Sequence, residues 1–134
     1  MTMAKISSIS VGSIVREMLL SSEDITAITE NIFPVATDAA ELPYIFYRVG
    51  NIAHDPTKDM AGADTVAVDI TCCAGSYAEC VNLAEAVRSA LDYRQGSDDN
   101  FVMRSCIMTG YSQSWADDAH IGSMSFSVKI NKKQ

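Results

Sequence analysis

One segment of this chain, from Thr65 to Asp92, constrains the possible folds more than any other. Over residues 65–73, apolar and small polar side chains alternate, the period of two typical of a strand with one buried face. A capping box follows, in which the Ser76 hydroxyl can accept a hydrogen bond from the Glu79 amide. The segment therefore predicts a strand that passes directly into a helix.

The predicted helix is amphipathic over residues 76–92. Apolar side chains recur at three- and four-residue spacing, at Tyr77, Cys80, Val81, Ala84, Val87 and Leu91. Polar side chains occupy the other side. We expect this helix to cover the apolar face of the sheet, with Leu91 closing its last turn.

The N-terminal third is predicted to be helical. Apolar spacing favours a helix over Ile9–Leu20, and acidic residues in a first turn favour a second helix from Glu23 to about Thr29. Residues 32–34 end in proline and are predicted to terminate that second helix.

Four strands are predicted in the remainder. Leu42–Pro43 opens one, residues 65–73 form another, and Phe101–Trp115 and His120–Ile130 form a closing hairpin. The last strand alternates buried Met, Phe, Val and Ile with Ser123, Ser125, Ser127 and Lys129, so its exposed face is rich in hydroxyls.

The predicted fold class is α+β. A mainly antiparallel sheet of about four strands, in two hairpins, carries the long helix between them and the N-terminal helices on one face. The 134 residues suit a single domain, 1–134, with a helical segment 1–34, a sheet-plus-helix core 42–131 and a flexible arm 51–64.

Composition excludes several classes of function. With 17 acidic and 10 basic residues the formal charge is -7, which argues against binding a nucleic-acid backbone. No apolar run approaches the length of a membrane span, and the serine-rich start is not a signal peptide. No catalytic, cofactor-binding or metal-binding motif is present, so the prediction is a protein that is not an enzyme and holds no cofactor or metal.

The four cysteines are predicted to be reduced, structural thiols. Cys72 and Cys73 are adjacent on a strand and point to opposite faces, so they cannot share a compact site. The alternation and the helical spacing place Cys72 and Cys80 in the core.

The connector 51–64 is long for a link between two strands, and such connectors are uncommon unless they are functional or disordered. Asp69 is also unusual, because aspartate is disfavoured in the middle of a strand. The candidate interface residues are His54, Asp55, Lys58, Asp59, Met60 and Asp69.

An ordered set of features carries a family resemblance. Leu42-Pro43-Tyr44 opens a strand, a long connector follows, and Val66–Ile70 precedes a helix that begins at Ser76-Tyr77 and ends in Val87–Leu91. This set resembles the tail-completion, or tail-terminator, proteins of long-tailed bacteriophages and prophages. The similarity spans about Leu42 to Ile130, and the adjacent Cys72-Cys73 pair departs from it.

The resemblance implies a structural subunit that assembles as a ring, commonly a hexamer, on the tail tube and provides the head–tail joining surface. Its implied partners are other copies of itself, the tail-tube protein and a head-completion or connector protein, without sequence-specific nucleic acid or a membrane. The implied location is the host bacterial cytoplasm during assembly and the virion tail or neck afterwards.

Two other readings remain open. One is a head-side connector, or neck, protein. The other is a small cytosolic enzyme or ligand-binding module with its site near Cys73, Gly75 and His54.

Overall fold

The computed structural model describes residues 12–34, 41–55, 63–97, 101–116 and 118–132. In chain order the elements are α1 (Gly12–Leu20), α2 (Glu23–Thr26), β1 (Ile32–Pro34), β2 (Tyr44–Asp55), β3 (Ala63–Ala74), α3 (Tyr77–Leu91), β4 (Gly96–Ser97), β5 (Phe101–Ala116) and β6 (Ala119–Lys132).

The strands of the described residues form one six-stranded sheet in the order β1-β2-β3-β6-β5-β4. β1 runs parallel to β2, and every other neighbouring pair is antiparallel. The α+β class is confirmed, but the prediction of about four antiparallel strands is wrong in detail. The two extra strands, β1 and β4, have three and two residues, too few for alternation to show in the sequence.

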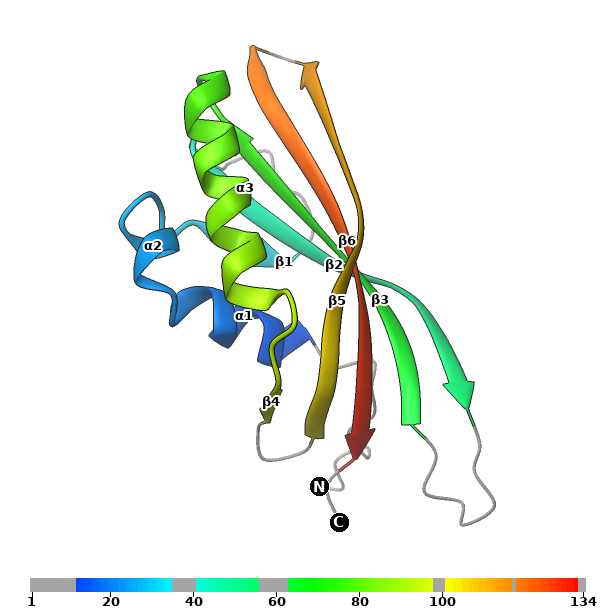
Figure 1. The fold of residues 1–134 in the computed structure, drawn as a ribbon. Coiled ribbons are helices and arrows are strands. Elements are labelled where there is room, and N and C mark those ends of the chain that lie inside the picture. The colour runs from blue at the N-terminus through cyan, green and yellow to red at the C-terminus, as the bar shows by residue number, and fades with distance from the viewer. Residues whose placement is uncertain (1–11, 35–40, 56–62, 98–100, 117, 133–134) are drawn as a thin grey trace, which may run out of the picture.

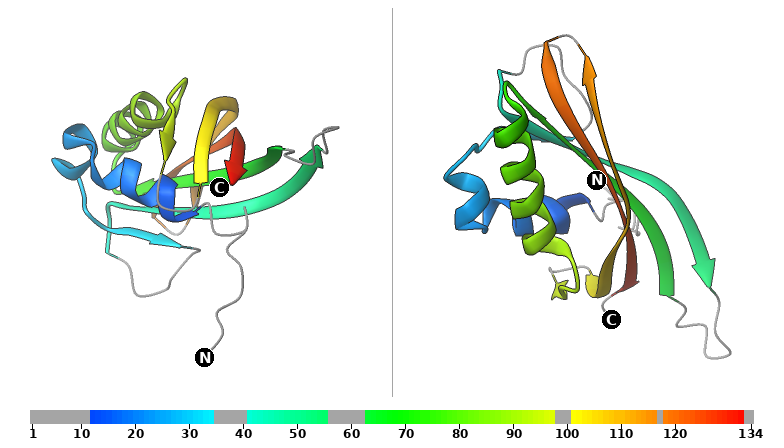
Figure 2. Two further views of the ribbon diagram at one scale, coloured as in Figure 1. Left: turned by 90° about the horizontal axis from the view of Figure 1, so that it is seen from below. Right: turned by 45° about the horizontal axis from the view of Figure 1, so that its top comes forward.

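The three helices that the structure describes lie on one face of the sheet (Figures 1 and 2). Alternate residues of the two central strands point into the core beneath them, namely Val66, Val68, Ile70 and Cys72 from β3 and Met124, Phe126, Val128 and Ile130 from β6. Leu91 is 1% exposed at the end of α3, where it was predicted to pack. The other face of the sheet has no second layer among the described residues.

Helix α3 begins where the capping box predicted. Ser76 is the N-cap, and its hydroxyl oxygen accepts a hydrogen bond from the Glu79 amide at 3.2 Å. α2 ends at Thr26, earlier than predicted. The Thr29 side chain instead donates to the Pro43 carbonyl oxygen at 2.8 Å and accepts from the Asn31 amide at 3.0 Å, which leads the chain into β1.

Both ends of the predicted arm 51–64 are strand. β2 continues to Asp55 and pairs with the start of β3, with Asp55 opposite Ala63. The register shifts between Val49 and Ile52, and this bulge breaks the period of two in the sequence. Lys58, Asp59 and Met60 lie outside the described residues.

Candidate assembly surface

The sheet face opposite the helices carries small and hydroxyl side chains. From β3 and β6 these are Thr65, Ala67, Asp69, Thr71, Ser123, Ser125 and Ser127, with Lys129 at one end. All but Lys129 are partly buried by their strand neighbours alone. The predicted hydroxyl-rich face is confirmed. We call it the open face.

Asp69 lies in the middle of the open face and joins three strands. One carboxylate oxygen, Oδ2, lies 3.2 Å from an Arg48 guanidinium nitrogen on β2. The other, Oδ1, accepts a hydrogen bond from the Ser125 hydroxyl on β6 at 2.9 Å. Both partners stand directly opposite Asp69 in the strand register. These contacts explain why a strand tolerates aspartate here, and the sequence did not reveal either partner.

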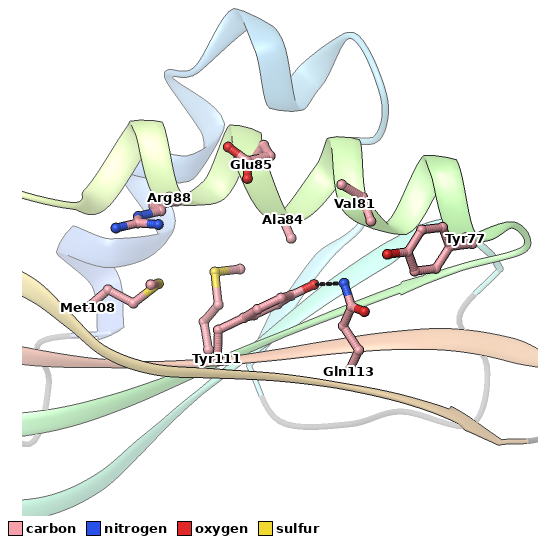
Figure 3. Close-up of a pocket in the computed structure, with 9 residues that line it drawn as sticks. Tyr77, Val81, Ala84, Glu85, Arg88, Met108, Tyr111 and Gln113 are labelled. Carbon is pink, nitrogen blue, oxygen red and sulfur yellow. Dashed lines mark hydrogen bonds between the residues drawn. The ribbon is translucent and has the colours of Figure 1, made fainter.

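A second feature lies on the helix side of the sheet, between α3 and β5. A pocket of about 130 Å³ is lined by Tyr77, Val81, Ala84, Glu85 and Arg88 from α3 and by Met108, Tyr111, Gln113 and Met124 from the sheet (Figure 3). Gln113 Nε2 donates to the Tyr111 hydroxyl oxygen at 2.9 Å. A Cβ on Gly122 would stand 3.1 Å from that oxygen, so glycine gives the tyrosine room to lie across β6.

Two exposed aromatic side chains, Tyr77 and Tyr111, line this pocket, and a third, Trp115, lies further along β5. Trp115 is 62% exposed, Tyr77 58% and Tyr111 40%. The Tyr77 ring meets His120 edge-on, with ring centroids 6.1 Å apart. The exposure of Tyr111 and Trp115 shows that neither ring belongs to the core of this chain. The pocket is smaller than the 300–1,000 Å³ common for small-molecule sites.

All four cysteines are free and buried. Burial raises the pKa of Cys72, Cys73 and Cys80, and burial together with the nearby Asp92 carboxylate raises the pKa of Cys106 to about 12. The inward placement of Cys72 and Cys80 is confirmed. These thiols are poor nucleophiles at neutral pH, because the thiolate is the reactive form.

The alternative site near Cys73, Gly75 and His54 does not form. Cys73 stands opposite Tyr44, and His54 stands opposite Asp64 at the far end of the same ladder. The two rows lie nine positions apart along β3, roughly 30 Å at about 3.3 Å per residue. Within the described part of the chain, no cluster of three or more His, Cys, Asp or Glu side chains could hold a metal ion, and no helix is long and apolar enough to cross a membrane.

The fold and these surfaces define a small α+β subunit suited to contacts with other chains: one sheet face has no second layer among the described residues, and exposed aromatics line one edge. The comparisons agree. The family model of tail completion protein gp17 matches residues 14–118, so the chain belongs to this family of phage structural proteins, as the resemblance predicted.

A solved structure shares the fold. A chain of the virion of a native gene transfer agent particle matches with a TM-score of 0.75, covering 93% of this chain and 99% of that chain at 12% sequence identity. No curated protein matches in sequence. Membership of the family points to a structural role in a phage particle, and the solved structure shows that the fold is shared.

Proposed function

We propose that this protein caps the phage tail tube as a ring, a hexamer in the commonest form of the family, and forms the surface that joins tail to head. The observation that carries the proposal is the open face, where the Arg48–Asp69–Ser125 contacts hold charged and hydroxyl groups in a fixed pattern on a surface without a second layer among the described residues. Its partners are other copies of the chain, the tail-tube protein and a head-completion or connector protein.

The negative net charge is consistent with a protein that lies beside DNA without binding it. A formal charge of -7 repels the phosphate backbone, which suits a ring through which DNA passes. The protein assembles in the host bacterial cytoplasm and then resides at the tail or neck of the virion.

The arm 51–64 is the second part of the proposal. The β2–β3 hairpin curves away from the helical layer (Figure 1), and His54, Asp55, Lys58, Asp59 and Met60 of the arm contact a neighbouring subunit or the tube. Such an arm increases contact area between subunits without enlarging the core.

The test measures assembly and tail completion together. Native mass spectrometry and negative-stain imaging give the oligomer of the wild type with and without tail tubes, and complementation of a phage lacking this gene gives joined particles. We expect a ring and restored joining. Replacing residues 56–62 with a short Gly-Ser turn should leave the monomer folded, because closure entropy changes slowly with loop length, and should impair both readouts.

A wild type that stays monomeric with tail tubes present, and fails to complement, would refute the ring. Rings that bind head connectors but not tubes would instead favour the head-side neck reading. A shortened variant that joins heads to tails normally would refute the arm alone.

A further inference from the structure

The outer edge of β5 is closed along its first part. β4 pairs with Val102 and Met103. Beyond β4, the Tyr93 amide donates to the Cys106 carbonyl oxygen at 2.7 Å, and the Met108 amide donates to Asp92 Oδ1 at 2.9 Å. The edge is therefore occupied as far as Met108.

Beyond Met108 the edge is open, as the register shows. The Cys106 carbonyl and the Met108 amide point away from β6. Cys106 and Met108 therefore form non-hydrogen-bonded pairs with their partners on β6. β6 keeps an unbroken register with β3, so its alternate residues keep one orientation. The residues of β5 that pair with these alternate residues of β6 must then also direct their backbone N–H and C=O outward. They are Tyr111, Gln113 and Trp115.

These outward backbone groups have no hydrogen-bond partner within the described residues. The Tyr111 and Gln113 side chains line the pocket on the helix side (Figure 3), and the alternation along β5 places Trp115 on the same side. A strand added along this edge would place alternate side chains on that side too. One apolar side chain of the added strand would then lie over the pocket. We call residues 111–116 the open β5 edge.

Charge indicates the occupant. The chain carries a formal charge of -7, so two copies have like net charge and repel each other as they approach. Ser105–Ala116 contains no charged residue and no proline. A long edge strand without charge or proline is the kind that pairs with another chain. A second copy therefore meets no charged side chain from residues 105–116 at this edge.

The same sheet supplies a complementary edge. β1 covers β2 only at Ile45–Tyr47, and the rest of β2, Arg48–Asp55, has no neighbouring strand on its outer side within the described residues. Val66 directs its backbone N–H and C=O toward β6, by the same alternation that orients β5. Ile52 stands opposite Val66, so the Ile52 backbone N–H and C=O point outward from the sheet. β2 runs antiparallel to β5, so a copy placed beside β5 in the same orientation continues the antiparallel order.

We propose that the open β5 edge binds the outer edge of β2 from a second copy, in a head-to-tail contact that extends the sheet from subunit to subunit. A head-to-tail contact uses two different surfaces and closes into a ring when the rotation allows. Gln113 and Ile45 lie in the same row across the sheet. Pairing of the open β5 edge with Arg48–Asp55 of the next copy therefore offsets neighbouring subunits along the strand direction. Because of this offset, the strands tilt relative to the ring axis, as in a closed barrel. This contact rests on the proposed ring and names its interface.

Two proline variants, each of which blocks one of the two edges, test the contact. Gln113→Pro and Ile52→Pro each remove an outward amide and leave the pairing with β6 or β3 intact. We expect each variant alone to be monomeric in native mass spectrometry. A one-to-one mixture should form a dimer, since each partner retains one working edge. A variant that assembles alone as the wild type does, or a mixture that stays monomeric while both variants show wild-type circular dichroism, would overturn the contact.

Trp115→Lys covers the case in which Ile52→Pro fails to fold. It places a charge on the open β5 edge at an exposed position, and Tyr93→Lys is the matched control because Tyr93 is 78% exposed away from that edge. We expect the tryptophan variant to stay monomeric and the tyrosine control to assemble. Equal assembly of the two variants would contradict the proposal.

Trp115 also reports on the wild type, because it is the single tryptophan of the chain. Assembly should shift its emission to shorter wavelength and reduce quenching by acrylamide. Rings in which Trp115 remains as accessible as in the monomer would overturn the β5 contact and leave the ring standing. A chain that never assembles, even with tail tubes, would overturn both.

Discussion

Replacing Asp69 with alanine separates the stability of the monomer from its assembly. The substitution removes the ion pair with Arg48 and the hydrogen bond from Ser125. The two charged side chains are 63% and 37% exposed, so the ion pair contributes about 0.2–1 kcal/mol. A hydrogen bond to a charged acceptor is worth about 1.5–3 kcal/mol, and partial exposure lowers this to about 1 kcal/mol.

The expected loss in free energy of unfolding is therefore about 1–2 kcal/mol, too little to unfold a typical domain. Urea unfolding followed by circular dichroism measures it. A double-mutant cycle with Arg48→Ala should give a coupling below about 1 kcal/mol. If the open face contacts other subunits, the variant should assemble and complement poorly despite being folded.

Glu17→Ala is the matched control, because it removes one acidic charge from an exposed position on α1. It should assemble as the wild type does. A loss above about 3 kcal/mol for Asp69→Ala would show that the carboxylate is a buried structural group, contrary to its 37% exposure in the structure. Normal assembly and complementation by Asp69→Ala would refute the role of the open face.

Three further predictions concern the core and its boundary. Leu91→Ala should lower the free energy of unfolding by about 2–5 kcal/mol because the side chain is 1% exposed, and a loss under about 0.5 kcal/mol in urea would show that this part of the core is loosely packed. Ser76→Ala should cost about 1 kcal/mol by losing the N-cap, whereas Ser76→Thr should retain most of it in the same assay. The pKa of Cys106 is raised from 9.0 to about 12, so the contribution of this thiol to stability is complete below pH 9 and declines as pH rises toward 12. Cys106→Ala should therefore reduce the decrease in the urea midpoint between pH 8 and 10. An unchanged dependence of the midpoint on pH would contradict this.

Several features of the fold were predicted correctly from the sequence, and others were not. The strand over 65–73, the Ser76 cap and the inward Cys72 and Cys80 were predicted because each depends on near neighbours in the chain. The bulge after Val49 defeated the same reasoning, since it breaks the period of two that signals a strand. β2 and β3 therefore extend into residues predicted to be a connector.

The candidate surfaces were less predictable. Asp69 was singled out by its position in a strand, but its partners Arg48 and Ser125 are 21 and 56 residues away in sequence. The open β5 edge left one signal, the uncharged stretch Ser105–Ala116. That signal alone does not say which part of the strand lacks a neighbour.

The sequence by itself determined the α+β class, the buried faces of β3 and β6 and the start of α3, because periodicity and capping act within a few residues. Only the tertiary structure decided the order of the six strands and the parallel entry of β1. It also decided where β4, Asp92 and Tyr93 stop covering β5. Strand order and edge exposure arise from contacts between residues far apart in the chain, and no local pattern encodes them.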